Sequence, residues 1–291
     1  MKKVSVFALV IVMLLSGCAA TVDCYDIVAT TLPVYDFTSM ICEDTELTVG
    51  RLVTENVSCL HDYTLKVDQM RMLEGSDLVV ISGAGLEEFL EDALHNSNTV
   101  IDASADAHLH EAEDTHEAHH DHTHNHDHDP HIWLSPHNAK IMANNICAGL
   151  SQAYPQYQDV FQKNLSVLEG KLNDLQVYGE TQLAELSCRE LITFHDGFTY
   201  FAESFDLTIL EAIEEESGSE ASAEEIIHLI ETVDDHRLPA VFTEVSGSTA
   251  YAGIIASETG VAIYRLDMAM SADGYFDAMY HNIDTIKEAL K

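Results

Sequence analysis

Short apolar runs and amphipathic stretches follow one another along the chain, which predicts alternating strands and helices. Residues 77–81, Asp-Leu-Val-Val-Ile, form a continuous apolar run typical of a strand buried on both faces of a parallel sheet. Similar runs predict strands at 25–30, 100–101, 191–194, 207–213, 240–243 and 262–266. Strands that alternate with helices predict an α/β fold of two lobes, each with a mainly parallel sheet flanked by helices.

The longest helical pattern lies in the middle of the chain. Apolar residues from Phe161 to Leu186 recur at spacings of three and four, so one helix is expected over 155–186 as a rigid strut between the lobes. Shorter helices are expected at 34–41, 87–94, 222–233, 250–259 and 275–290. The chain then divides into a leader (1–17), a first lobe (18–150), a linking helix (151–187) and a second lobe (188–291).

The first residues have the pattern of an export signal. Lys2 and Lys3 precede an apolar run, 4–15, which is too short to span a bilayer but has the length of a secretory hydrophobic segment. The run ends in Leu-Ser-Gly-Cys, and the small residues before Cys18 are similar to the lipobox of bacterial lipoproteins. Lipidation of Cys18 would anchor a monomeric protein to the outer face of the cell membrane; an ordinary signal peptide is the alternative.

The chain is strongly acidic. It has 50 Asp and Glu residues against 13 Lys and Arg, a formal net charge of -37. This balance argues against a nucleic-acid partner, which needs a basic surface, and favours cations. An odd number of cysteines follows Cys18, so at least one thiol is free, and a bridge from Cys42 to Cys59 is possible. These cysteines are Cys24, Cys42, Cys59, Cys147 and Cys188.

Histidines are concentrated in one segment, residues 108–129, which holds nine of them with seven acidic residues and no Lys or Arg. Such a segment cannot bury apolar surface, so we expect it to be disordered without a ligand. Neutral imidazoles bind metal ions and carboxylates concentrate them, which predicts a weak zinc-collecting loop. A tolerated low-complexity insertion is the alternative. The histidines are His108, His110, His116, His119, His120, His122, His124, His126 and His128.

Residues 116–120 of this segment also match the zinc-peptidase pattern His-Glu-x-x-His. That chemistry requires a stable helix with both histidines facing a cleft, and the segment has no apolar face to hold one. We interpret the match as an accident of composition.

Potential metal ligands directly follow three predicted strands of the second lobe. They are His195, Glu244 and Asp267. In open α/β sheets ligands bind beyond the carboxyl ends of the strands. One such residue alone would be explained as a polar strand end, whereas the three together favour a metal site.

The first lobe supplies two more candidate ligands. His61 follows a turn-like stretch. His131 lies just before a helix that Ser135 and Pro136 are expected to begin, which would give its imidazole a fixed position.

Four segments resemble the metal-binding (cluster A-I) substrate-binding proteins of zinc and manganese ABC transporters, solute-binding protein family 9. They are Leu-His-Asp-Tyr (60–63), Asp-Pro-His-Ile-Trp-Leu-Ser-Pro-His-Asn-Ala (129–139), Phe-His-Asp-Gly-Phe-x-Tyr-Phe (194–201) and Glu-Thr-Gly-x-x-x-Tyr-x-Leu-Asp (258–267). The resemblance covers essentially the whole mature chain. It implies two α/β lobes joined by a long helix, a metal between them, and delivery of that metal to an ABC permease with its ATPase subunit.

The resemblance also implies a ligand set: His61, His131 and His195, with Asp267 as fourth ligand or near neighbour and Glu244 in a supporting role. Manganese-type members usually carry glutamate where this chain has His195, and three imidazoles favour Zn²⁺. Zinc is therefore expected, and a manganese receptor is the alternative. The family commonly has His-x-Tyr-Glu-Pro where residues 61–65 are His-Asp-Tyr-Thr-Leu, which puts the polar surroundings of His61 in doubt.

Two other functions remain open. An extracellular zinc hydrolase would need an open coordination position and a general base, for which Glu244 is the candidate. A surface adhesin could use the same fold for contacts with a host. The expectation is a receptor that performs no covalent chemistry.

Overall fold

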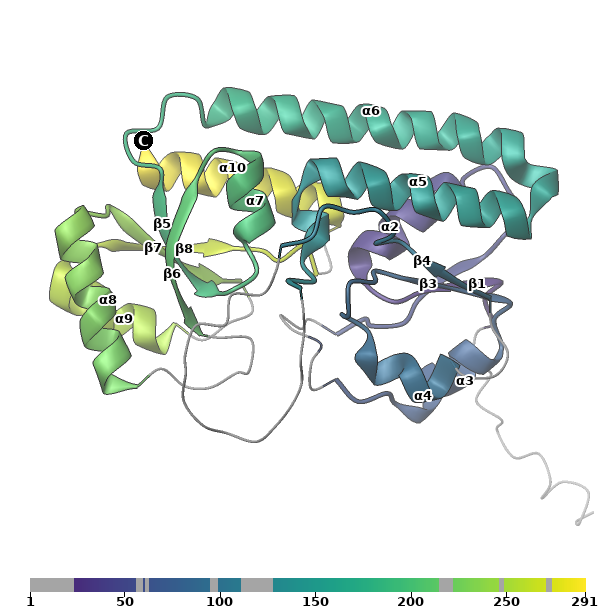
Figure 1. Ribbon diagram of the computed structural model, residues 1–291, viewed down its shortest axis with the longest axis horizontal. Helices are drawn as coiled ribbons and strands as arrows, with labels where there is room; N and C mark the ends of the chain where they lie inside the picture. The colour runs from purple at the N-terminus through teal and green to yellow at the C-terminus, as the bar shows by residue number, and fades with distance from the viewer. Residues whose placement is uncertain are drawn as a thin grey trace, which may run out of the picture.

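Both sheets of the computed structural model have four parallel strands (Figure 1). The structure describes residues 24–55, 60, 63–94, 99–110, 128–214, 222–245, 249–270 and 274–291. The order in the first lobe is β2 (Val49–Arg51), β1 (Ile27–Ala29), β3 (Leu78–Ile81), β4 (Thr99–Asp102). In the second lobe it is β6 (Thr208–Glu214), β5 (Glu190–His195), β7 (Ala240–Glu244), β8 (Ala262–Leu266). The predicted two-lobe α/β fold is confirmed.

Helices cover both faces of each sheet (Figure 1). In the first lobe α2 (Leu32–Ile41) and α5 (Pro136–Ala153) cover one face, and α3 (Val67–Glu74), the 3-10 turn η1 (Glu88–Leu90) and α4 (Glu91–Leu94) cover the other. In the second lobe α7 (Thr199–Ser204) and α10 (Tyr275–Leu290) lie opposite α8 (Ala223–His236) and α9 (Ala250–Thr259). Because both faces are buried, β1 and β3 are apolar at every position, and β7 is apolar up to its polar carboxyl end, Thr243 and Glu244.

The long helix α6 (Gln158–Gln182) runs across both lobes and packs on α5, α2 and α10 (Figure 1). Its 25 residues span about 37 Å at 1.5 Å per residue. It begins after the 3-10 turn η3 (Pro155–Tyr157) and ends four residues earlier than predicted. Leu183 and Leu186 continue the apolar stripe into the core as a non-helical turn, which the periodicity alone did not distinguish from helix.

A second difference concerns residues 87–94, where one helix was expected. The carboxylate of Glu87 accepts the backbone N–H of Ser82 (2.7 Å) and of Gly83 (3.0 Å) and the hydroxyl of Thr30 (2.6 Å). These bonds hold Glu87 in the turn after β3, so the chain forms only η1 and then the single turn of α4. Local caps are as predicted elsewhere: Ser222 and Glu225 form a capping box, and Gly260, with a φ of 80°, ends α9.

The possible bridge from Cys42 to Cys59 is not formed, because Cys42 is a free thiol. Cys42 caps the C-terminus of α2 and is buried in the same core cluster as Cys147 of α5. Burial, with a smaller effect of Cys147, raises the pKa of the Cys42 thiol to about 12. Cys188 is also a free thiol, whereas Cys59 lies outside the described residues.

The leader 1–17 and Cys18 also lie outside the described residues, so the export signal and the lipid anchor stay predictions. Within the part of the chain that the structure describes, no helix has the length and apolarity needed to cross a membrane.

Alanine substitutions at two glycines of α6 should change the free energy of unfolding in opposite directions. A Cβ on Gly179 would lie 2.1 Å from the ring of Phe205, whereas a Cβ on Gly170 would meet nothing within 4 Å. Alanine is more favourable than glycine inside a helix, so we expect Gly170→Ala to raise the free energy of unfolding by about 0.5–1 kcal/mol. Gly179→Ala should lower the free energy of unfolding by about 1–3 kcal/mol, because the added methyl group overpacks against Phe205. Urea unfolding measures both, and equal responses would contradict close packing of α6 on the second lobe.

Candidate metal centre

Three predicted ligands of the second lobe lie at the carboxyl edge of three neighbouring strands. His195 is the last residue of β5, Glu244 is the last of β7, and Asp267 directly follows β8. Because β5, β7 and β8 are adjacent and parallel, their ends meet at one edge of the sheet. Glu244 and Asp267 are only 5% and 8% exposed, so both carboxyl groups lie inside the molecule. The structure does not describe the side chain of His195.

Hydrogen bonds fix Asp267 in place. Its backbone N–H donates to Asn282 Oδ1 (2.7 Å), and Asn282 Nδ2 donates to its backbone oxygen (2.7 Å). The N–H of Ala269 donates to Asp267 Oδ1 (2.8 Å). Ala269 has a φ of 56°, in the left-handed region, and the chain bends at this point. The backbone of Asp267 is therefore held by α10, and its carboxylate is held by its own loop.

His131 is positioned by the carboxylate two residues before it. Asp129 Oδ1 accepts the backbone N–H of His131 (2.9 Å) and lies 2.8 Å from the imidazole Nδ1. An ionised carboxylate only accepts hydrogen bonds, so Nδ1 carries the proton, and in the neutral imidazole Nε2 has the lone pair. His131 is 1% exposed. This is the pairing that orients metal-binding histidines in proteins.

The segment of His131 is bound directly to the segment of Asp267. Trp133, in the 3-10 turn η2 (Ile132–Leu134), donates from Nε1 to the backbone oxygen of Met268 (2.8 Å). Tyr275, at the start of α10, donates from its hydroxyl to the backbone oxygen of Trp133 (2.9 Å). Since Met268 is the neighbour of Asp267, these two bonds bring the two candidate ligand segments together across the lobe junction.

Several predicted residues lie outside the described part of the chain: His61, and the loop histidines from His116 to His126. Tyr63, two residues after His61, donates from its hydroxyl to Glu55 (2.8 Å). The described ends of the histidine segment are joined, because Asp129 N donates to the backbone oxygen of His110 (3.1 Å). The predicted disorder between these ends and the zinc-peptidase match at 116–120 also fall on residues that are not described.

The structure shows a grouping that the sequence patterns did not reveal. Among the described side chains, the one group of three or more possible ligands whose ligand atoms lie within 4.8 Å of one another is His108, His110 and Glu203. His131, Glu244 and Asp267 do not form such a group. Glu203 lies in α7, so neither its spacing nor its neighbours in the sequence mark it as a partner of the two histidines. Asp129 was not singled out either, although its place two residues before His131 could have identified it.

We expect Asp129→Asn to weaken zinc binding by about 10–100-fold, because a neutral amide neither holds the imidazole as firmly nor raises its basicity. Competition with a chromogenic chelator measures the change. Asp235→Asn, on the exposed face of α8, is the matched control and should leave the affinity unchanged. Unaltered binding in Asp129→Asn would show that Asp129 does not orient a ligand.

Comparison with known proteins assigns the family. The family model described as "Zinc-uptake complex component A periplasmic" matches residues 27–289. The high-affinity zinc uptake system protein ZnuA of Bacillus subtilis is 30% identical over 283 residues, 92% of this chain and 88% of that protein. The zinc-binding lipoprotein AdcA of Streptococcus pneumoniae is 27% identical over 281 residues, 90% of this chain but only 55% of AdcA.

A solved structure agrees with these relatives. A crystal structure of ZnuA matches with a TM-score of 0.81 and 30% identity, and the match covers 92% of this chain and 99% of that one. Fold, motifs and family model therefore agree, and the chain belongs to the family of the zinc-uptake complex component A, the zinc solute-binding receptors of ABC transporters.

Proposed function

We propose that this chain captures Zn²⁺ outside the cytoplasm through His61, His131, His195 and Asp267 and delivers it to an ABC permease driven by its ATPase subunit. The observation that carries the ligand set is the buried pair of Asp129 and His131. It presents one imidazole nitrogen of fixed tautomer at the junction of the lobes. The bond from Trp133 to Met268 fixes that nitrogen relative to the loop of Asp267.

The chemistry of the proposed ligands suits zinc. Three neutral imidazoles and one carboxylate give the four nitrogen and oxygen ligands of a closed tetrahedral zinc site. Manganese prefers a shell richer in oxygen, which disfavours the manganese alternative. Asp267 Oδ1 already accepts the N–H of Ala269, so Oδ2 would bind the ion. Glu244, buried at the end of the neighbouring strand, would support the site by a hydrogen bond to a ligand.

The cellular context follows from the leader and the acidic surface. The proposed receptor is a monomer held at the outer face of the cell membrane by lipid on Cys18. The histidines from His108 to His128 would collect zinc weakly beside the transport site. This context agrees with AdcA, whose name describes a zinc-binding lipoprotein.

A closed ligand shell also distinguishes the receptor from the zinc hydrolase. A hydrolase keeps one coordination position for water and a base beside it. Glu244→Gln should therefore leave the protein a zinc binder, and loss of a hydrolytic activity with zinc retained would instead favour the enzyme.

Metal exchange tests the function. The full chain, stripped with a chelator and offered zinc and manganese, should retain one tightly bound zinc and release manganese readily. Trp133 is the only tryptophan, and its ring centroid lies 5.3 Å from that of His131, so zinc should also change its fluorescence. Tight manganese with weak zinc would contradict the function, and fluorescence that does not change at saturating zinc would remove His131 from the ligand set.

A further inference from the structure

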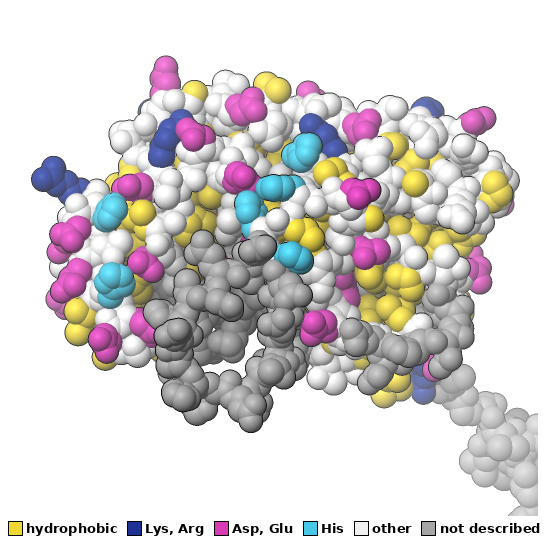
Figure 2. Space-filling view, in the orientation of Figure 1, with side chains coloured by type: hydrophobic (Ala, Val, Ile, Leu, Met, Phe, Trp, Pro, Cys, Tyr) yellow, Lys and Arg dark blue, Asp and Glu magenta, His cyan; other side chains and the backbone are white. Residues whose placement is uncertain are grey.

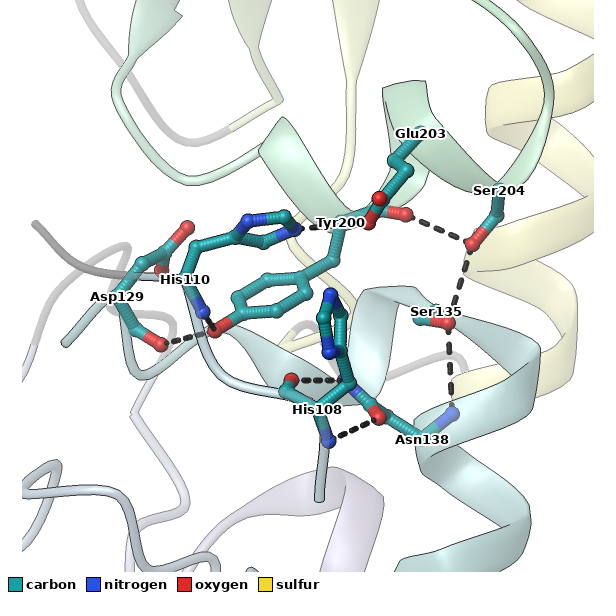
Figure 3. A network of polar contacts seen from close by, with 8 residues as sticks. All are labelled: His108, His110, Asp129, Ser135, Asn138, Tyr200, Glu203 and Ser204. Carbon is teal, nitrogen blue, oxygen red and sulfur yellow. Dashed lines mark hydrogen bonds and ion pairs between the residues drawn. The ribbon is translucent and has the colours of Figure 1, made fainter.

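Two histidines and a glutamate outside the proposed transport site meet where the lobes join (Figure 3). His110 Nε2 lies 2.8 Å from Glu203 Oε2. The rings of His108 and His110 are 5.1 Å apart between centroids. One ligand atom from each of the three residues lies within 4.8 Å of the other two. The three side chains therefore converge on one point.

Hydrogen bonds hold the backbone of both histidines. His108 N donates to Asn138 Oδ1 (3.0 Å), and Asn138 Nδ2 donates to the backbone oxygen of His108 (2.9 Å). His110 N donates to the hydroxyl of Tyr200 (3.0 Å), which itself donates to the backbone oxygen of Asp129 (2.8 Å). None of these four bonds uses an imidazole nitrogen. The scaffold thus positions both rings without occupying the atoms that bind metals.

The group joins the two lobes and is open to solvent. His108 and His110 follow β4 of the first lobe, whereas Glu203 lies in α7 of the second. His108 and Glu203 line a pocket of about 330 Å³, and Figure 2 shows histidine side chains gathered on this face of the molecule. The Glu203 side chain is 57% exposed and that of His110 is 28% exposed. An ion can therefore reach the group directly, and the net charge of -37 favours a cation.

We propose that His108, His110 and Glu203 form a second Zn²⁺ site, separate from the transport site and independent of its ligand set. Two imidazoles and one carboxylate are zinc ligands, and water completes a tetrahedral shell. Zinc bonds of about 2.0–2.2 Å require ligand atoms about 3.3–3.5 Å apart, which small rotations of these three side chains would provide. The ion would join the lobes, and the hydroxyl of Tyr200 links the backbone of His110 to the segment of Asp129, which orients His131.

A zinc titration can distinguish this site from diffuse binding to the histidine segment. The titrated protein is the full chain with residues 111–127 replaced by a short glycine linker. The 3.1 Å bond from Asp129 N to the backbone oxygen of His110 shows that a short linker spans the gap. We expect this shortened chain to bind two zinc ions, one tightly and one more weakly. A single bound ion would overturn the proposal and assign the weaker binding to residues 111–127.

Variants of the shortened chain identify the ligands. Glu203→Gln should raise the Kd of the weaker ion by at least about 100-fold and leave the tight ion unchanged, because removing a ligand costs more than the 10–100-fold lost with a supporting residue. The double variant His108→Ala, His110→Ala should do the same. Retention of both ions in Glu203→Gln would overturn the site.

Two controls make the outcomes separable. Glu231→Gln, on the exposed face of α8, should keep both ions and excludes a general effect of charge. His131→Ala should lose the tight ion and keep the weaker one. If His131→Ala instead leaves the tight ion in place, the proposed transport ligands are wrong, while the result with Glu203→Gln still decides the second site.

Discussion

His131→Ala should weaken tight zinc binding by about 1,000-fold or more, a loss of at least about 4 kcal/mol. The substitution removes one of four proposed ligands and leaves the Asp129 carboxylate without the imidazole that it orients. Loss of a supporting residue alone costs 10–100-fold, so loss of a ligand should exceed that range. Competition with a chelator of known affinity measures the Kd, because direct titration saturates for tight sites.

The control for this result is His228→Ala. The imidazole of His228 pairs with Glu211 at the surface and is 63% exposed, so its removal should leave zinc binding unchanged. Thermal unfolding of the zinc-free variants checks that His131→Ala still folds, and His131→Gln repeats the test with a side chain closer in size. Zinc binding as tight as in the parent protein, in both His131 variants, would place the transport site elsewhere.

The parts of the fold that depend on residues close together in the sequence could be predicted from the sequence. The strand 78–81 is apolar at every position because helices cover both of its faces, and a shorter apolar run, Ala-Val-Phe, identified β7. The caps at Ser222 and Gly260 depend on one side chain or one backbone angle, so the residue type indicates the structure. The end of α6 was missed because the core accepts Leu183 and Leu186 whether or not the backbone is helical.

Contacts between distant residues could not be predicted in the same way. Glu203 is 93 positions from His110, and Met268 is 135 positions from Trp133. Nothing in the spacing of these residues marks them as partners, since both contacts exist only after the lobes dock. The strand ends could be read in part, because parallel strands bring their carboxyl ends to one edge. That rule grouped Glu244 and Asp267 but did not reveal the hydrogen bonds that fix Asp267.

Trp133→Ala should lower the free energy of unfolding by about 3–5 kcal/mol and also weaken tight zinc binding. The indole is fully buried between the lobes, so its removal leaves a large cavity and removes the bond from Nε1 to Met268. Trp133→Phe keeps most of the apolar volume and loses mainly that bond, so a smaller loss of about 1–3 kcal/mol is expected. Urea unfolding of the zinc-free protein measures both values.

The control separates stability from ligand placement. Leu229→Ala creates a cavity in the cluster beneath α8 and α9, which is separate from the core cluster of Trp133, and should cost about 2–5 kcal/mol without changing the affinity for zinc. If Trp133 acts by fixing the segment of His131 relative to that of Asp267, both Trp133 variants should lower zinc affinity even where the protein is fully folded. Trp133→Phe and Leu229→Ala with the same zinc affinity as the parent would show that the junction contributes packing alone. A lower zinc affinity in Trp133→Phe, with the affinity of Leu229→Ala unchanged, would show that the bond to Met268 sets the distance between two ligands from different lobes.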